Sequence, residues 1–266
     1  MRVRLVLLGF GAVLLLAGTA GAQPRSGVVH VRMPPGTSLI DLGRALYAGN
    51  CSTCHGSAGE GITRPGSQVG AGAENGQGPS LRGVGAQAAD FYLRTGYMPL
   101  STPGRQPWRS RVLFSDHEIR ALVAYVASLG HGPPIPKPQS RRGDVARGQR
   151  LFTQHCAGCH QVVAEGGYVS GARVPPLKDT TDVEMAEAVR TGPYVMPKFT
   201  RRDISDRQLD SIIAYVDYAK HPDDRGGWAI GHIGPIPEGM VTWLLAAAVL
   251  VAACTVIGKR LKGGPE

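Results

Sequence analysis

Two short clusters in this chain of 266 residues combine two thiols with an adjacent histidine. Cys51, Cys54 and His55 lie in the segment CSTCH, and the same order returns in CAGCH at residues 156–160. Two thiols at this spacing add to the vinyl groups of a haem, and the histidine that follows reaches the iron as its proximal ligand. The pattern therefore predicts two covalently bound haem c groups, one on Cys51, Cys54 and His55 and the other on Cys156, Cys159 and His160.

Two other uses of paired cysteines have to be weighed. A thioredoxin-like dithiol would not need the histidine and would accompany a β-α-β unit, which this sequence lacks. A structural zinc ion held by the four thiolates is conceivable, but the two pairs lie far apart in the sequence and both histidines would then be coincidences. Because the motif occurs twice within matching units, the sequence favours haem.

Met98 and Met196 are the candidates for the second axial ligand of each iron. Both precede a proline and follow Arg-Thr-Gly in the same slot of their unit. Met185 lies in the helical pattern DVEMAEAV without a counterpart in the first unit, so we expect it to pack in the core. An iron with histidine and methionine on opposite sides has no open position, which favours electron transfer over peroxide chemistry. The predicted axial pairs are His55 with Met98 and His160 with Met196.

A proline follows each cluster in a repeated short motif. Pro79 in GPSL and Pro175 in VPPL are placed to offer a backbone carbonyl to Nδ1 of His55 and His160, a bond that would fix the ring. The alternative is that both are ordinary loop prolines. The other histidines have no repeated partner, and we interpret them as surface or core residues, with His155 the one expected to touch haem without binding iron. They are His30, His117, His131, His155, His221 and His232.

Helices have to position these residues, and the same helix signals occur in both units. A glycine and an aromatic residue four positions apart precede each cluster, which places them on one helix face where another helix can approach closely. An amphipathic helix around a tyrosine closes each unit. These markers are Gly43, Tyr47 and Tyr125 in the first unit and Gly148, Phe152 and Tyr215 in the second.

The fold class predicted from these signals is all-α, with two tandem units at residues 38–130 and 144–222. The segment HGPPIPKPQSRRG, residues 131–143, is Pro-rich, basic and without periodicity. It is typical of a semi-rigid linker, which could either space the units apart or lie flat and hold them in contact.

The charge distribution argues against a nucleic-acid-binding protein. Of the formal net charge of +9, seven charges lie in residues 1–40 and 131–143. The units show no basic face with interleaved aromatic residues. Five cysteines are an odd number, and Cys254 lies alone in an apolar run, so a disulfide framework is not indicated.

Apolar segments at both ends indicate a membrane location. Residues 1–22 read as an export signal with a charged start and an Ala-x-Ala site, although an uncleaved anchor is the alternative. Residues 240–258 would span roughly 28 Å as a transmembrane helix. The basic residues Lys259, Arg260 and Lys262 follow at once, which predicts a cytoplasmic C-terminus and units on the extracytoplasmic side of the cell membrane.

Each unit resembles a class I cytochrome c domain. The whole chain resembles the dihaem cytochrome c subunit of the actinobacterial-type cytochrome bcc (bc1) complex. This resemblance covers nearly the full length and rests on the export signal, the tandem units, Arg-Thr-Gly followed by Met-Pro in both, and the tail GGWAIGHIGPIPEGMVTW before one C-terminal helix. The tail is the most specific feature, because other dihaem cytochromes usually lack it.

The resemblance implies a subunit of quinol–cytochrome-c reductase that does not itself bind quinol and has no independent catalytic site. A Rieske iron–sulfur subunit would deliver electrons from menaquinol to one haem, and an aa3-type cytochrome c oxidase would accept them from the other. Quinol would bind on the cytochrome b subunit. No nucleic acid is expected as a partner.

Two alternative functions remain. A membrane-anchored dihaem cytochrome c could serve another oxidase or dehydrogenase of the cbb3-like kind, although those proteins carry the anchor at the N-terminus. A dihaem peroxidase would need one iron with an open sixth position, which Met98 and Met196 argue against.

Overall fold

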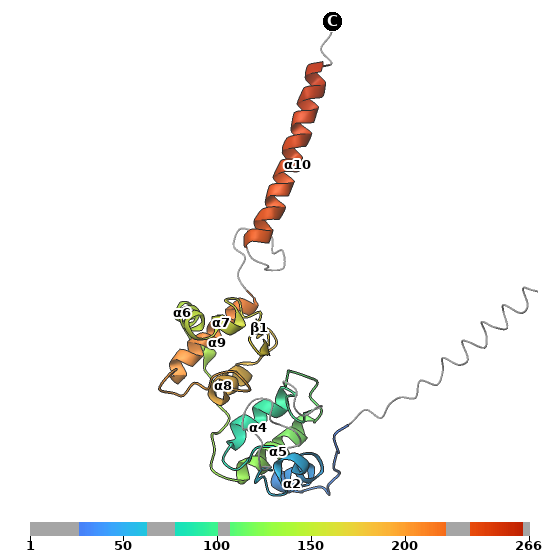
Figure 1. Ribbon diagram of the computed structural model, residues 1–266, viewed down its shortest axis with the longest axis vertical. Helices are drawn as coiled ribbons and strands as arrows, with labels where there is room; N and C mark the ends of the chain where they lie inside the picture. The colour runs from blue at the N-terminus through green and yellow to red at the C-terminus, as the bar shows by residue number, and fades with distance from the viewer. Residues whose placement is uncertain (1–26, 63–77, 101–106, 222–234, 263–266) are drawn as a thin grey trace, which may run out of the picture. The chain divides into compact units, whose positions relative to one another are not determined.

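In the computed structural model the described residues are 27–62, 78–100, 107–221 and 235–262, and they are mainly helical. One compact unit runs from Met1 to Val216 and includes both cysteine clusters, and a second runs from Asp217 to Glu266. The first half of the larger unit contains α2 (Leu39–Asn50), α3 (Ser52–His55), α4 (Gly85–Arg94) and α5 (Asp116–Ser128). The second half contains α6 (Val145–His155), α7 (Ala157–His160), α8 (Asp182–Thr191) and α9 (Asp206–Lys220) (Figure 1).

The close approach of another helix that was predicted at each glycine is confirmed, and the partner is the last helix of each half. A Cβ atom built on Gly43 would collide with the backbone carbonyl oxygen of Ala121 in α5. One built on Gly148 would collide with the carbonyl oxygen of Ser211 in α9. The helices therefore cross with their backbones in contact, and only glycine fits at the crossing point.

Aromatic rings fill the space beside each crossing. The ring centroids of Tyr47 and Tyr125 lie 5.1 Å apart, and those of Phe152 and Tyr215 lie 5.4 Å apart. All four side chains are buried, and Tyr47 and Phe152 are each 1% exposed. Aromatic burial of this kind is a large share of the stabilisation that a small helical domain can obtain.

Capping boxes begin a helix in each half. The Ser115 side chain accepts from the backbone N–H of Glu118, and the Glu118 carboxylate accepts from the backbone N–H of Ser115. Thr181 and Glu184 make the same reciprocal pair at the start of α8. These bonds satisfy N–H groups that a helix cannot pair internally, so the sequence S/T-x-x-E sets where each helix begins.

A small hairpin in the second half was not predicted from the sequence. Strand β1 (Gly167–Val169) pairs with β2 (Ala172–Val174) in antiparallel register, with Gly167 opposite Val174. Gly171 in the connecting turn has a φ of 82°, a conformation that favours glycine. The hairpin joins α7 to the segment of Pro175, and it leaves the all-α fold class correct.

The linker lies flat against both halves, the second of the two arrangements that the sequence left open. The backbone N–H of Gln87 in α4 donates to the carbonyl of Pro133 at 3.1 Å. At the other end, the N–H of Gln139 donates to Asp210 Oδ1 at 2.7 Å. A short 3₁₀ helix, η2 (Ser140–Arg142), then leads into α6.

A polar contact joins the two halves where α4 meets α8. Gln87 Nε2 donates to Thr191 Oγ1 at 3.0 Å. Nearby, Arg109 binds the Glu184 carboxylate, with Nη2 and Oε1 3.1 Å apart. We call the residues along this contact, Gln87, Asp90, Arg94, Glu184, Glu187 and Thr191, the α4–α8 seam.

The last helix, α10 (Pro235–Lys262), belongs to the second compact unit. Within it, Gly239–Leu261 has a mean hydropathy of 2.4, long and apolar enough to cross a membrane. The predicted span, residues 240–258, lies inside this segment. The predicted export signal at residues 1–22 and the first half of the tail GGWAIGHIGPIPEGMVTW lie outside the described residues.

Candidate functional site

A single helical turn carries the first cluster. Helix α2 ends at Asn50, and Cys51 caps it before α3 continues to His55. The N–H groups of Cys54 and His55 both donate to the carbonyl of Cys51, at 3.1 and 2.9 Å. Residues three and four apart on a helix share a face, so the turn presents both thiols and the imidazole on one side.

The second cluster is built in the same way. Cys156 caps α6, and the N–H groups of Cys159 and His160 donate to its carbonyl at 3.1 and 2.9 Å. Among the residues that the structure describes, no three His, Cys, Asp or Glu side chains gather closely enough to hold a metal ion. The four thiols are thus not brought together into one tetrahedral set.

The predicted hydrogen bonds to the proline carbonyls are confirmed at both histidines. His55 Nδ1 lies 2.8 Å from the carbonyl oxygen of Pro79, and His160 Nδ1 lies 3.2 Å from that of Pro175. Because a carbonyl can only accept, Nδ1 carries the proton and the opposite nitrogen, Nε2, keeps the lone pair that a metal needs.

Burial keeps both imidazoles in the form that can bind a metal. Removal from water lowers the pKa of His55 and of His160, and the proline carbonyls oppose this only in part. Both rings are therefore neutral at neutral pH. The ring of His55 also leaves no room at Gly78, where a Cβ would lie 2.6 Å from Nδ1.

The thiols of both clusters are free. Burial raises the pKa of Cys51 to about 12 and that of Cys156 to about 11, with smaller contributions from Cys54 and Cys159. The first thiol of each pair is therefore neutral in the unloaded chain. Two free thiols and a neutral imidazole on one face of a helical turn fit the attachment of haem c.

The two predicted axial methionines follow equivalent helices. Met98 lies after α4, and its backbone N–H donates to the carbonyl of Tyr92 at 3.0 Å. Met196 lies after α8, and its N–H donates to Pro193 at 3.0 Å. Both side chains belong to half-buried residues, whereas Met185 is buried in α8 with 6% of its surface exposed. The assignment of Met98 and Met196 as iron ligands stays a prediction.

Two tyrosines tie down the segments that follow the clusters, a role that the sequence reading missed. Tyr47 Oη donates to the carbonyl of Gly56 at 2.7 Å, and Tyr215 Oη donates to that of Val162 at 2.7 Å. The first tyrosine lies on the first helix of its half and the second on the last. The sequence did contain a signal for this difference. Phe152 takes the place of Tyr47 in the second unit, so the hydroxyl there comes from the last helix.

His155 lies near Phe199, in the segment after Met196. The two ring centroids are 6.0 Å apart in an edge-to-face arrangement. His30 is paired instead with Glu118, with Nδ1 2.8 Å from Oε1. Its contact with α5 agrees with a role in the fold.

Family profiles match each half of the larger unit separately. The profile described as "Cytochrome c" matches residues 40–130, and that described as "Cytochrome C oxidase, cbb3-type, subunit III" matches residues 143–216. The two profiles together cover both cysteine clusters. The fold class of two cytochrome c domains is therefore confirmed, and both domains carry covalently bound haem c.

Curated relatives align with nearly the whole chain. The cytochrome bc1 complex cytochrome c subunit of Corynebacterium diphtheriae is 35% identical over 94% of this chain and 93% of its own length. That of Mycobacterium tuberculosis is 34% identical over 94% of this chain and 90% of its own length. A cbb3-type cytochrome c oxidase subunit CcoP of Azospirillum is 27% identical over only 65% of this chain and 60% of its own length.

A solved chain of the Kuenenia stuttgartiensis reducing HAO-like protein complex aligns with 71% of this chain and 99% of its own length, at 15% identity and a TM-score of 0.35. The full-length relatives decide the assignment, since they share both domains and the C-terminal region in one order. The chain belongs to the family of cytochrome bc1 complex cytochrome c subunits.

Proposed function

We propose that this chain is the dihaem electron-transfer subunit of a membrane menaquinol:cytochrome c reductase of the bc1 type. The observation that carries the proposal is the full-length similarity to bc1 complex cytochrome c subunits, together with two complete attachment sites in one chain. Cytochrome b and a Rieske iron–sulfur protein are then the partners within the complex. The terminal acceptor is an aa3-type cytochrome c oxidase.

Each cytochrome c domain holds one haem through its own residues. In residues 38–130, Cys51, Cys54, His55 and Met98 would hold the first haem. Residues 144–222 contribute Cys156, Cys159, His160 and Met196. A haem with two protein ligands supplies reversible one-electron exchange at its iron.

The residues of this chain hold each haem, orient its histidine ring and bury the helix crossing beside its cluster. The proline carbonyls fix the two imidazole rings through Nδ1, and the buried aromatic pairs close the helix crossings beside the clusters. Quinol oxidation belongs to other subunits, so no residue of this chain is assigned to it. With both haems bound, the chain would serve as the electron carrier between the Rieske protein and the oxidase.

The anchor sets the direction in which the domains face. Helix α10 carries a membrane-length apolar segment that is followed by Lys259 and Arg260. Because basic residues are retained on the cytoplasmic side, the C-terminus is cytoplasmic and both haem domains lie outside. Residues 1–22 direct export.

The test is purification of the full chain through a C-terminal tag in mild detergent. We expect two covalent haems on a denaturing gel and co-purification of cytochrome b and a Rieske protein. A dihaem chain that comes alone, or with a cbb3-type oxidase, would favour the rival assignment. A band without covalent haem would refute both.

A further inference from the structure

Each cytochrome c domain ties the two ends of its methionine loop together with an arginine. We define the methionine loop by its described residues, which are 95–100 and 107–115 between α4 and α5, including Met98, and 192–205 between α8 and α9, including Met196. Arg94 ends α4 and Asp116 begins α5, with Arg94 Nη1 and Asp116 Oδ1 2.9 Å apart. The equivalent pair in the second domain is Arg190 Nη2 and Asp206 Oδ1, 2.8 Å apart.

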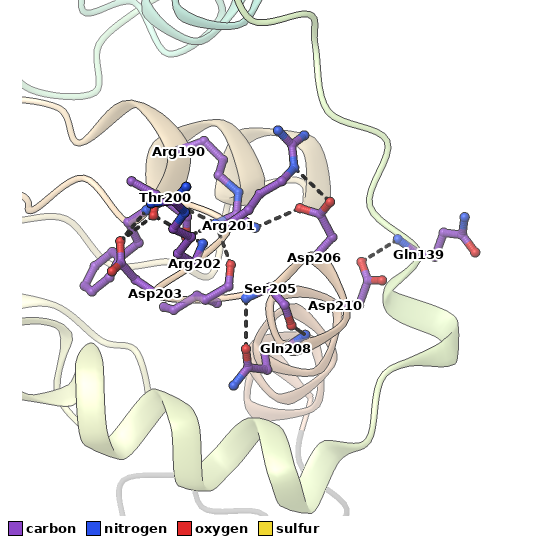
Figure 2. A network of polar contacts seen from close by, with 12 residues as sticks. Gln139, Arg190, Thr200, Arg201, Arg202, Asp203, Ser205, Asp206, Gln208 and Asp210 are labelled. Carbon is purple, nitrogen blue, oxygen red and sulfur yellow. Dashed lines mark hydrogen bonds and ion pairs between the residues drawn. The ribbon is translucent and has the colours of Figure 1, made fainter.

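In the second domain the same arginine also holds the loop itself. Arg190 is only 8% exposed, and its Nη1 donates to three backbone carbonyls that follow Met196. Figure 2 shows its side chain reaching across the base of the loop toward Asp206. The acceptors are Phe199 O at 3.2 Å, Thr200 O at 3.0 Å and Ile204 O at 2.7 Å.

In the first domain the arginine is oriented from its own helix. Arg94 Nε lies 2.9 Å from both carboxylate oxygens of Asp90, a residue that is 4% exposed. The hydrogen bond from Arg94 lowers the pKa of Asp116, with further help from Arg120, so that carboxylate is ionised at neutral pH. The guanidinium therefore joins a buried acid on α4 to the first residue of α5.

We propose that Arg94 and Arg190 are positioning residues that close the base of each methionine loop and thereby keep Met98 and Met196 on the haem iron. This inference rests on the proposed axial role of the two methionines. The physical reason is that a thioether is a neutral ligand on a flexible side chain, so it stays bound only if its loop has few alternative conformations. A planar guanidinium with several donors restricts such a loop more than a single ammonium group can.

We call the ion pairs Arg94–Asp116 and Arg190–Asp206 the two clasps. The structure provides a matched control for each clasp, because each aspartate also binds a second arginine that does not belong to the preceding helix. Arg120 Nη1 lies 2.5 Å from Asp116 Oδ2, one turn along α5. Arg201 Nε lies 2.9 Å from Asp206 Oδ2 (Figure 2). Arg120 and Arg201 are 56% and 71% exposed, and Arg201 lies in the methionine loop itself. Removing either therefore takes away an exposed ion pair of the same aspartate and keeps the bond from α4 or α8, so the comparison isolates the bond that joins the two helices.

The experiment compares Arg190→Gln with Arg201→Gln, and Arg94→Gln with Arg120→Gln, in the full haem-loaded chain in detergent. The readouts are the near-infrared band of methionine-bound ferric haem and a redox titration that resolves the two haems. We expect Arg190→Gln and Arg94→Gln each to lose up to about half of the band and to lower the potential of one haem, because each affects one site of two. The double variant Arg94→Gln/Arg190→Gln should lose most of it, while both controls match the wild type.

Further variants keep the test decisive if a glutamine variant folds poorly. Asp206→Asn keeps the carbonyl bonds of Arg190 but weakens the clasp, and Arg190→Lys keeps the charge without the fork. Both should show a smaller loss than Arg190→Gln. A clasp variant with an unchanged band and unchanged potentials would overturn the inference, as would an equal loss in Arg201→Gln. A wild-type chain that lacks the band would refute the methionine ligands and the clasp together. Met196→Leu removes the ligand directly, so a loss of the band in Met196→Leu but not in Arg190→Gln would refute the clasp alone.

Discussion

At the scale of single residues, the chemistry is set by how each histidine is held. The carbonyls of Pro79 and Pro175 accept from Nδ1 of His55 and His160, and burial lowers the pKa of both rings. A neutral ring fixed in one tautomer offers Nε2 to the iron without a competing proton. These contacts repeat in both domains, so both histidine rings are fixed in the same way and present the same nitrogen.

Replacing methionine by leucine at three positions tests the predicted methionine ligands. We expect Met98→Leu and Met196→Leu to keep both haems covalently attached but to lower one potential each, on the order of tenths of a volt within the ~0.8 V range that axial ligands set. Each should also lose its share of the near-infrared methionine–iron band. Met185→Leu is the control, because Met185 packs in α8 and a volume-conserving change there should leave both readouts unchanged. A loss of the band in Met185→Leu instead would reverse the assignment in the second domain.

At the scale of elements, each domain depends on one crossing between its first and last helix. The sequence predicted that another helix approaches closely at this point, because a glycine and an aromatic residue four apart recur before both clusters, but it did not identify the last helix as the partner. It also predicted the proline carbonyls, since Pro79 and Pro175 occupy the same slot. Local patterns of this kind can be read from the sequence, because the spacing of residues along a helix alone decides which of them share a face.

Other features could not be read from the sequence, because they depend on pairs that are distant along the chain. Tyr215 on α9 donates to Val162 after α7, and Arg190 on α8 binds Asp206 at the start of α9, so both contacts depend on how these elements pack. The hairpin β1–β2 is too short for an alternating pattern to identify it. The contact between α4 and α8 likewise uses polar residues, which in a sequence look like an ordinary solvated helix face.

The helix crossing predicts the effect of adding one methyl group. Gly43→Ala and Gly148→Ala should each destabilise their domain by about 1–3 kcal/mol or more, because the new Cβ meets a backbone carbonyl that cannot move without shifting a helix. This loss outweighs the gain of up to ~1 kcal/mol that alanine gives over glycine in a helix. Denaturant unfolding followed through the haem absorption of the full chain measures the change.

Gly49→Ala is the control for the added methyl group, because Gly49 is an exposed residue of the same helix as Gly43 and a Cβ there would make only an ordinary contact with Val29, 3.4 Å away. We expect it to be neutral or slightly stabilising. Equal destabilisation by Gly49→Ala and Gly43→Ala would show that the crossing is looser than the structure indicates.

At the scale of the whole molecule, the two cytochrome c domains meet at a seam that holds a buried acid. Glu187 is 0% exposed, and within the described part of the chain neither carboxylate oxygen has a hydrogen-bond partner. Burial, with smaller contributions from Asp90 and Glu184, raises its pKa to about 8, and Arg94 opposes this shift only in part. Burial also raises the pKa of Asp90, although Arg94 counteracts the shift. An unpaired charge would be costly here, so Glu187 is mainly protonated at neutral pH.

The stability of the domain pair should therefore fall as the pH rises. Because the pKa of Glu187 is higher in the folded chain than its ordinary value of 4.5, its stabilising contribution is complete below about pH 4.5 and is lost up to about pH 8. The slope is at most about 1.4 kcal/mol per pH unit, and the dependence levels off above pH 8.

Glu187→Gln imitates the protonated acid and should remove this part of the pH dependence. The difference in denaturant midpoint between this variant and the wild type, measured on the full chain, should therefore grow from about pH 5 to about pH 8. Glu165→Gln, which removes an exposed carboxyl, should follow the wild-type curve, because its loss takes no buried charge out of the seam. Parallel curves for Glu187→Gln and the wild type would mean that Glu187 is ionised or solvated in the folded chain, and the seam would then carry no proton-dependent stability.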